Sequence, residues 1–358
     1  MKDATVLIFS GHNQRAVFSL LKRLRQNRIS TSIIESYLND PVKDSIYQSD
    51  ILLKRTSRAL SKDLFQKIVK ESIQKNPLIS RIILIPTSEY INTFFLKNIN
   101  FLQGIGLIYP IRNHNSYTKL TNKYECRELV QRFTSLSLPK IIDPLNITSP
   151  FIAKPKKNIK GKEVLYPHII MEPSKAKISD YDTADWYFED FIQGQSFYYC
   201  GYLDRYGNIQ SYWQKNYIQQ SNGKSILLAK STRNPGVNTR ELNKLLKRSE
   251  FSGPFMFEII KSGSIFYFIE INPRFWGPFE LSFSANSKLF QLFLKDLNFK
   301  NGKLPKLKKN FNSWYSWKEG FNWQDEKYYP CIKEIEQSKL RALIYNNDVY
   351  KKLKINKS

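Results

Sequence analysis

Residues 255–280, FMFEIIKSGSIFYFIEINPRFWGPFE, decide the fold of this chain. Two apolar runs rich in Phe, Ile and Tyr flank the short segment 261–264, a pattern that predicts a β-hairpin. The second strand carries Glu270, Asn272 and Arg274 at intervals of two residues. Because successive side chains of a strand alternate between its faces, these three point to the same side.

Glu258, on the first strand, joins that face if the hairpin turn has an odd number of residues. With a three-residue turn at 262–264, Lys261 pairs with Ile265, and Glu258 becomes a diagonal neighbour of Glu270, with about 7 Å or less between their β-carbons. A two-residue turn would point the two carboxylates to opposite faces, because a slip of one residue reverses the face. A shared site therefore requires the odd turn.

Two carboxylates and an amide oxygen suit a hard cation such as Mg²⁺, with Mn²⁺ as the alternative. Such a cation also takes phosphate oxygens as ligands. Arg274, beside them, can clamp a phosphate oxygen. The competing interpretation makes Glu258 and Glu270 the solvated side of an antiparallel sheet. Both faces of the hairpin are apolar, however, so both should be covered, and carboxylates there need a metal or a cation. We therefore predict a metal site at Glu258, Glu270 and Asn272.

Glu258, eleven further residues and then Glu-x-Asn-x-Arg resemble the metal-binding signature of the ATP-grasp superfamily. The segment EINPRFWGP at 270–278 is most similar to the carboxylate–amine ligase and carbamoyl-phosphate-synthase-like branch of that superfamily. The resemblance covers roughly residues 5–298 and implies an ATP-grasp fold with an amino-terminal Rossmann-like parallel α/β domain. It also implies that the γ-phosphate of ATP activates a carboxylate as an acyl phosphate, releasing ADP, and that an amine then forms an amide or peptide bond.

Strands that alternate with helices predict a parallel sheet in the first third of the chain. Strands are expected at 4–12, 29–34, 49–54 and 81–86, and helices at 13–27 and 62–74. We predict an α/β fold with an α+β ATP-binding part, divided into a Rossmann-like domain at 1–115, a small ATP-grasp subdomain with a phosphate loop at 116–188, a carboxy-terminal ATP-grasp subdomain with the metal site at 189–300, and a basic, aromatic extension at 301–358. Ser88 and Glu89 follow the strand ending at Pro86, where open α/β sheets place ligands.

Lysines are the expected contacts for the nucleotide's phosphates. Lys154 lies in the apolar strand PFIAKP, where an ammonium is costly unless it meets an anion. The resemblance implies that it contacts the α- and β-phosphates. Lys123 stands where the family often has a phosphate-side lysine; an ordinary exposed helix lysine is the equal alternative. The segment 156–164, KKNIKGKEV, matches the family's phosphate-covering loop in position, with Gly161 as its one glycine and lysines 156, 157, 160 and 162 as expected phosphate contacts.

The segment 186–194, WYFEDFIQG, resembles the family's linker around the adenine. The resemblance implies that Glu189 binds the adenine amino group and that Phe191 and Ile192 supply backbone contacts and apolar cover. A plain strand-edge acid is the alternative for Glu189. Ser196 occupies the position where many relatives have a glutamate for the ribose hydroxyls.

Three basic residues are the predicted catalytic groups. The resemblance implies that Arg274 holds the transferring phosphoryl group and then the anionic tetrahedral intermediate. Lys215, at the end of the second strand of a hairpin at 196–217, is expected to point towards the site. Arg233, in the loop STRNPGV, suits bidentate binding of a carboxylate or phosphate, and a solvated loop arginine is its alternative.

The chain of 358 residues has a net charge of +25, from 56 Lys and Arg against 31 Asp and Glu. That balance permits a second function, a non-catalytic binder of nucleic acid or of a membrane surface on a degenerate ATP-grasp scaffold. The intact acidic ligands oppose it. A third function, an ATP-grasp kinase or carboxylase, has no biotin-related or glutaminase segment to support it. The predicted partners are a small carboxylate and an amine, an amino acid or peptide, and not a specific nucleic acid.

Cysteine use and hydropathy bear on location. The three cysteines, Cys126, Cys200 and Cys331, are few, odd in number and widely spaced, which fits a reducing cytoplasm and opposes a disulfide framework or a zinc site. No apolar run approaches the ~20 residues of a membrane helix, and the first residues lack a signal-peptide pattern. We predict a cytoplasmic enzyme. The two substrates and the oligomeric state stay open.

Overall fold

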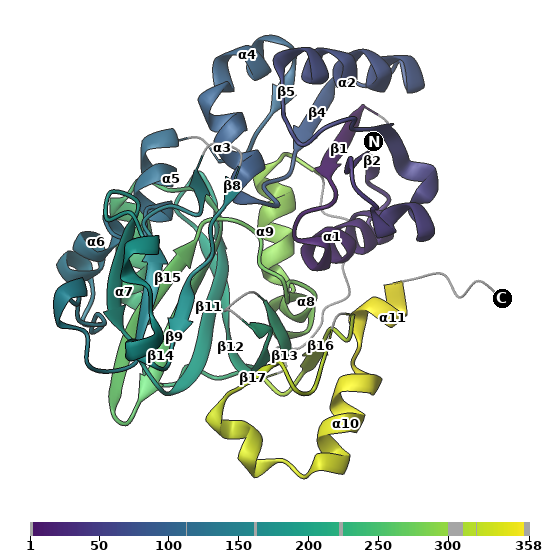
Figure 1. Cartoon of the computed structure of the whole chain (residues 1–358). Helices are drawn as coiled ribbons and strands as arrows, with labels where there is room; N and C mark the ends of the chain where they lie inside the picture. The colour runs from purple at the N-terminus through teal and green to yellow at the C-terminus, as the bar shows by residue number, and fades with distance from the viewer. Residues whose placement is uncertain are drawn as a thin grey trace.

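A parallel sheet forms the amino-terminal part of the chain, as predicted (Figure 1). The computed structural model describes residues 3–111, 113–160, 163–221, 225–299, 311–319 and 321–353. Strands of this sheet run in the order β3-β2-β1-β4-β5, and every pair is parallel. Its strands are β1 (Ala4–Phe9), β2 (Ser30–Glu35), β3 (Ile51–Lys54), β4 (Arg81–Leu84) and β5 (Leu107–Ile108).

Two of the helices that connect strands of the parallel sheet begin at serine caps. Ser61 and Ser88 cap α2 and α3 by accepting hydrogen bonds from the backbone N–H groups of Leu64 and Ile91. The helices of this part are α1 (Gln14–Gln26), α2 (Lys62–Lys75), α3 (Glu89–Lys97) and α4 (Ile99–Gly104), and two more, α5 (His114–Thr121) and α6 (Cys126–Phe133), follow it. The cap at Ser88 fixes Glu89 at the carboxyl edge of the sheet, where the sequence predicts a ligand.

The larger part of the chain is built on an antiparallel sheet of order β15-β14-β11-β12-β13-β16, in which β17 also pairs with β12. Its strands are β11 (Gln195–Leu203), β12 (Ile209–Gln219), β13 (Ile226–Thr232), β14 (Gly253–Ser262), β15 (Ile265–Asn272), β16 (Trp314–Ser316) and β17 (Lys327–Tyr328). Helices α8 (Leu281–Asn286) and α9 (Lys288–Asp296) pack on its central strands, and α7 (Thr239–Arg248) packs against α6.

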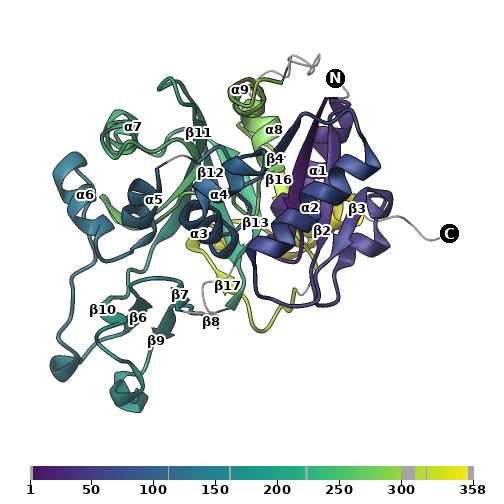
Figure 2. The ribbon, with the colours of Figure 1, turned by 90° about the horizontal axis from the view of Figure 1, so that it is seen from above.

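A small antiparallel sheet, of order β10-β6-β9, stands apart from the parallel sheet (Figure 2). Its strands are β6 (Phe151–Pro155), β9 (His168–Ile170) and β10 (Trp186–Asp190). Between it and α3 lies a short hairpin of β7 (Ile159–Lys160) and β8 (Glu163–Val164). Gly161 and Lys162 lie outside the described residues.

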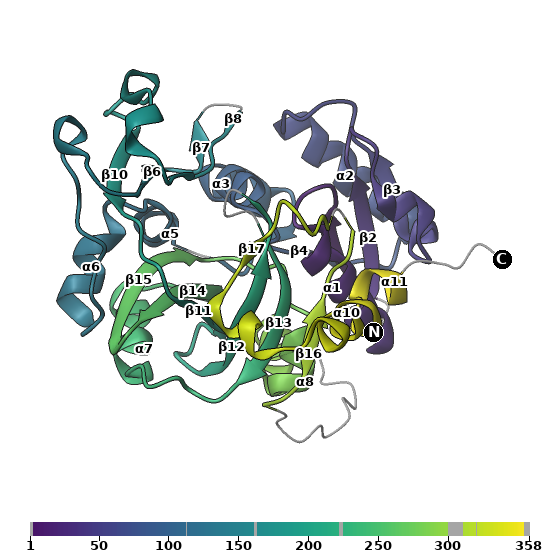
Figure 3. The ribbon, with the colours of Figure 1, turned by 60° about the horizontal axis from the view of Figure 1, so that its bottom comes forward.

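The carboxy-terminal segment joins the large sheet instead of forming a separate unit (Figure 3). Strand β16 pairs with β13 and β17 with β12, and the segment ends in α10 (Gln337–Asn346) and α11 (Val349–Leu353), the latter against α1. Tyr315 and Trp317 belong to the same hydrophobic core as Leu20 of α1 and Met256 of β14. The predicted domain limits stay predictions. Among the described helices, none has the length and apolarity that crossing a membrane requires.

The predicted hairpin of β14 and β15 forms, but its turn differs from the prediction. Ser262 pairs with Ile265, so the turn contains two residues, Gly263 and Ser264. Gly263 has a φ of 58°, in the left-handed region that glycine adopts without strain. The three-residue turn is therefore wrong, and the turn alone would separate the two carboxylates.

A β-bulge in β15 restores the alignment that the turn removes. Ile259 pairs with Phe268, whereas the next pair along the hairpin joins Glu258 to Glu270, so Ile269 is an extra residue without an opposite partner. One inserted residue reverses the face of everything beyond it. The two carboxylates consequently lie directly opposite each other, as close cross-strand neighbours.

Candidate active site

A cavity of about 440 Å³ lies between the small sheet and the β14–β15 hairpin. Its volume is in the range of small-molecule sites. Residues of the amino-terminal part and of β17 also line it. Nine of the predicted site residues line this cavity: Lys123, Lys154, Glu189, Phe191, Ile192, Glu258, Glu270, Asn272 and Arg274.

The Glu270 carboxylate is held by short contacts. The Lys123 ammonium lies 2.9 Å from its Oε2, and the Asn272 amide donates to its Oε1 at 2.6 Å. Arg274 donates in turn to the Asn272 amide oxygen at 3.2 Å. Burial alone would raise the pKa of Glu270, but the charges of Lys123 and Lys154 outweigh burial and lower this pKa below its ordinary value. Glu270 is therefore ionised near neutral pH.

Glu258 is supported from beneath by a buried row of polar side chains. Ser196 donates to its Oε1 at 3.2 Å, Asn216 donates to the Ser196 hydroxyl at 2.8 Å, and Gln214 donates to the Asn216 amide oxygen at 2.7 Å. Ser196 is fully buried and does not line the cavity. Its expected position beside the ribose is not supported, because its hydroxyl is used to orient the Glu258 carboxylate.

The two glutamates differ in proton affinity although they face each other. Burial and the negative charge of Glu270 raise the pKa of Glu258 to about 7. The charge of Lys327 opposes this increase most, followed by the hydrogen bond from Ser196 and the charge of Lys154. A cation bound between the two carboxylates, in addition to these lysines, would relieve their repulsion.

Glu258→Gln should raise the melting temperature of the metal-free protein near pH 8 and change it much less near pH 5. The pKa of Glu258 rises from its ordinary 4.5 to about 7 on folding, so the folded protein binds this proton more tightly than the unfolded chain. That stabilisation is complete below about pH 4.5 and is lost as the pH rises through about 7. Glutamine resembles the protonated carboxyl group and removes the loss. Thermal unfolding with a chelator checks this result; equal shifts at both pH values would contradict it.

Lys154 joins the small sheet to the bulge of the large one. Its ammonium donates to the Ile269 carbonyl at 2.6 Å and lies 2.8 Å from the Glu189 carboxylate. Arg127 contacts the other oxygen of Glu189 at 3.0 Å and the Pro139 carbonyl at 2.6 Å. Both oxygens of Glu189 are thus paired with cations, and an adenine amino group would have to compete with them. The geometry fits a different role for Glu189, that of holding Lys154.

The segment predicted to cover the phosphates lies over the cavity. Ile159 and Val164 of the β7–β8 hairpin line it, and Asn158 donates to Glu89 at 2.8 Å. Two of its described lysines have other partners: Lys156 donates to the Thr183 carbonyl at 2.9 Å, and Lys160 pairs with Asp185 at 2.5 Å. The phosphate contacts expected from these two lysines are not supported. The predicted contact of Gly161 lies outside the described residues.

Lys215 and Arg233 do not line the cavity. Lys215 lies on β12 between Gln214 and Asn216, whose side chains belong to the hydrogen-bonded row that holds Glu258. Because side chains alternate along a strand, Lys215 points to the opposite face of the sheet. Its ammonium lies over the ring of Tyr217, at 5.6 Å. Arg233 is exposed in its loop. The predicted catalytic roles of both residues are not supported by these positions.

Several solved structures share this arrangement of sheets. A biotin carboxylase from Campylobacter jejuni in complex with βγ-ATP matches with a TM-score of 0.58 at 15% identity, over 84% of this chain and 72% of that one. An L-amino acid ligase from Bacillus licheniformis matches with a TM-score of 0.56 at 14% identity, over 82% and 73% of the two chains. The chain has the ATP-grasp fold. The prediction from the sequence is confirmed at the level of fold.

A third ATP-grasp structure extends the comparison to a bound nucleotide. The biotin carboxylase domain of Hydrogenobacter thermophilus 2-oxoglutarate carboxylase, in complex with MgADP, ADP and bicarbonate, matches with a TM-score of 0.60 at 13% identity, over 87% of this chain and 73% of that one. No family model matches the sequence, and no curated protein does. At such identities the likeness establishes the fold, and the chemistry rests on this chain's own residues.

The donor set fits the divalent cation that the ATP-grasp fold implies. Glu258 is buried, the partly buried Glu270 lies opposite it, and Asn272 adds an amide oxygen two residues further on. Such a pair of like charges is costly without a cation between or beside its members. All three donors are oxygens, which Mg²⁺ prefers. The residues therefore suit magnesium.

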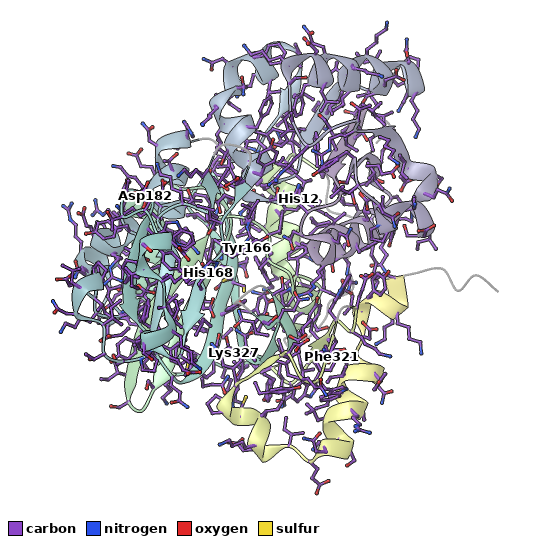
Figure 4. All side chains as sticks on the ribbon, in the orientation of Figure 1. His12, Tyr166, His168, Asp182, Phe321 and Lys327 are labelled. Carbon is purple, nitrogen blue, oxygen red and sulfur yellow. The ribbon has the colours of Figure 1, made fainter. Side chains whose placement is uncertain are left out.

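Sequence reasoning from the ATP-grasp resemblance missed Lys327. It comes from β17, which pairs with β12 at Gln219, and its ammonium lies 5.4 Å from the ring of Phe191. Burial lowers the pKa of Lys327, against the opposing charge of Glu258. The alternating segment around residues 327–329 is too short to predict a strand. Figure 4 shows Lys327 and His12, which line one cavity from opposite ends of the chain.

Proposed function

We propose that the protein is an ATP- and magnesium-dependent ligase that activates a carboxylate as an acyl phosphate and joins it to an amine, forming ADP and phosphate. The observation that carries this proposal is a single cavity with two chemically different walls. Phe191, Ile192 and Ile152 supply apolar surface from the small sheet and its linker, whereas Glu258 and Glu270 face it from the large sheet. An adenine ring needs the apolar surface, and the magnesium ion that accompanies a triphosphate needs the carboxylates.

Nucleotide binding would use the two sheets together. The adenine would lie against Phe191 and Ile192, with polar contacts from the backbone of the linker, since Glu189 already holds Lys154. Lys154 and Lys123 would supply the positive charge for the phosphates, because both residues line the cavity. Two of the similar structures are complexes with βγ-ATP and with MgADP, which supports a nucleotide at such a site.

Glu258, Glu270 and Asn272 would hold the magnesium ion, with Mn²⁺ as the alternative. When bound, the ion would link these side chains to the phosphates and offset their charge. Lys123 and Asn272 keep the Glu270 carboxylate in position through their contacts of 2.9 and 2.6 Å. Ser196 does the same for Glu258.

Chemistry would proceed in two displacements. A carboxylate oxygen of the first substrate attacks the γ-phosphorus, and the bond to the β–γ bridging oxygen breaks, so ADP leaves with the bonding electrons. The amine nitrogen then attacks the acyl carbon, loses a proton and expels phosphate. Arg274 would stabilise the negative charge that develops in both steps, because its guanidinium lines the cavity beside Asn272. Glu89 lines the same cavity from the start of α3 and would bind the amine.

Millimolar MgATP should raise the melting temperature of the protein. A ligand at about 100 times its dissociation constant stabilises the folded state by about 2.7 kcal/mol. ADP release, measured across amino acids and dipeptides with products identified by mass, then tests the ligase reaction. The structure of an L-amino acid ligase among the similar folds makes this substrate class the first choice. An unchanged melting temperature with MgATP would refute the proposal.

Lys327→Met should weaken MgATP binding by about 10-fold, the cost of losing one charged contact. Lys327 brings an ammonium to the cavity between Glu258 and Phe191. Lys333→Met is the matched control, since Lys333 is exposed in the same carboxy-terminal segment and carries the same charge. Calorimetric titration of both variants with MgATP decides the matter. Equal affinities of the two variants would remove Lys327 from the site.

A further inference from the structure

We propose that the protein binds an anionic group of one substrate, a carboxylate or a phosphate, through Arg55, Arg58 and His12 at the carboxyl edge of the parallel sheet. This inference rests on the proposed function and adds a second recognition point to its substrate. The group bound here differs from the carboxylate that is activated, because that carboxylate has to meet Arg274 and the γ-phosphate.

Arg55 is a buried cation whose hydrogen-bonding groups are mostly unused. It follows β3, and its side chain is 2% exposed. Its Nη1 donates to the Arg58 carbonyl at a long 3.4 Å, while its Nε and Nη2 have no hydrogen-bond partner among the described residues. The guanidinium is otherwise surrounded by the rings of Phe9 and Tyr37, at 5.9 and 5.8 Å. A buried guanidinium of this kind needs an anion.

Two more donors lie near Arg55. The Nε of Arg58 and the Nε2 of His12 are buried and have no partner within the described part of the chain. Burial and the charges of Arg55 and Arg58 lower the pKa of His12 to about 4, so its ring is neutral near pH 7. A neutral imidazole can donate from Nε2 to an anion without adding to the repulsion between the arginines. The cluster thus offers several N–H groups and two positive charges.

The acidic side chain beside the cluster is already committed. Asp40 accepts from the Ser10 hydroxyl at 2.9 Å and from the backbone N–H groups of Ser36 and Val42 at 3.0 and 3.1 Å. These bonds tie together the loops that follow β1 and β2. Asp40 therefore fixes the backbone, and an external anion is the partner that the arginines lack.

The cluster is connected with the candidate active site. His12 and Tyr90 line the cavity, and the Arg58 guanidinium lies over the Tyr90 ring at 5.6 Å. Asn13, next to His12, donates to the Phe275 carbonyl at 2.8 Å, which joins this edge to the residue after Arg274. A planar guanidinium binds carboxylate or phosphate in two-point fashion. One substrate can therefore be held at both places.

The test titrates the full-length protein separately with inorganic phosphate and with malonate, and follows binding by calorimetry. We expect millimolar or tighter binding of one probe, weakened about 10-fold or more by Arg55→Met and several-fold by Arg58→Met and His12→Ala. Arg248→Met is the control, since Arg248 is exposed on α7 and its loss changes the net charge equally. Stronger binding of phosphate assigns a phosphorylated substrate, and stronger binding of malonate a substrate with a second carboxylate.

Failure of the inference can be separated from failure of the proposed function. Wild-type protein that binds neither probe, or affinities unchanged in both arginine variants, would overturn the anion site. So would loss of binding in Lys154→Met alone, because the probe would then occupy the nucleotide region. Should Arg55→Met not fold, Arg58→Met and His12→Ala carry the test. Absence of MgATP binding by the wild type would instead refute the ligase proposal and leave the anion titration interpretable.

Discussion

Glu270→Gln should reduce ADP formation by more than about 100-fold while the fold survives, since loss of even an outer-shell partner of a metal costs 10- to 100-fold. The substitution keeps the shape of the side chain but removes the charge that faces Glu258 across the hairpin and Lys123 at 2.9 Å. Steady-state ADP release at several magnesium concentrations measures the effect. Raising the magnesium concentration should restore part of the activity.

Glu172→Gln is the matched control for this substitution. Its carboxylate is exposed and pairs with Lys175 on the surface, so the same change of charge should leave turnover unaltered. Full ADP-forming activity in the double variant Glu258→Gln, Glu270→Gln would rule out the metal site. Circular dichroism of each variant separates loss of chemistry from loss of fold.

Arg274→Ala should lower the turnover number by about 100-fold or more and leave MgATP affinity nearly unchanged, as expected when a group that stabilises transition-state charge is removed. Arg274 lines the cavity, and its guanidinium donates to the Asn272 amide oxygen at 3.2 Å. Lys154→Ala should behave in the opposite way and weaken MgATP binding, because in the proposed function Lys154 would contact the phosphates from the small sheet.

Arg233→Ala provides the control for charge, since Arg233 is an exposed arginine outside the cavity. Single-turnover kinetics and calorimetry together separate turnover from affinity in the three variants. Equal, mild losses of affinity in Arg274→Ala and Lys154→Ala would show that their roles are assigned wrongly. A loss of turnover in Arg233→Ala as large as that in Arg274→Ala would show that its loop closes over the site.

The sequence is sufficient to predict the parallel sheet, the central hairpin and the convergence of Glu258, Glu270 and Asn272. The sequence predicts this convergence through a three-residue turn, whereas the protein achieves it with a two-residue turn and a bulge at Ile269. Nothing in an apolar run of Ile and Phe marks which residue will bulge. The contact that occupies the Ile269 carbonyl comes from Lys154, more than a hundred residues away.

Other residues of the site depend on pairings that local patterns do not contain. The sequence predicts Lys215 at the site, but the register of β12 points its neighbours Gln214 and Asn216 towards Glu258 instead. Lys327 reaches the cavity through a two-residue strand that pairs with Gln219. A signal for Arg55 was present, as an arginine directly after an apolar strand of a parallel sheet, although its burial is visible in three dimensions alone.

The hydrogen bond between the Lys154 ammonium and the Ile269 carbonyl joins the small sheet to the large one. Lys154 belongs to the small sheet and Ile269 to the large one, and the bulge that aligns the carboxylates also presents this carbonyl. A phosphate that attracts the ammonium competes with this hydrogen bond. We therefore expect nucleotide binding to weaken this contact, so that the small sheet moves more easily relative to the large one when the ligand is bound than when it is absent.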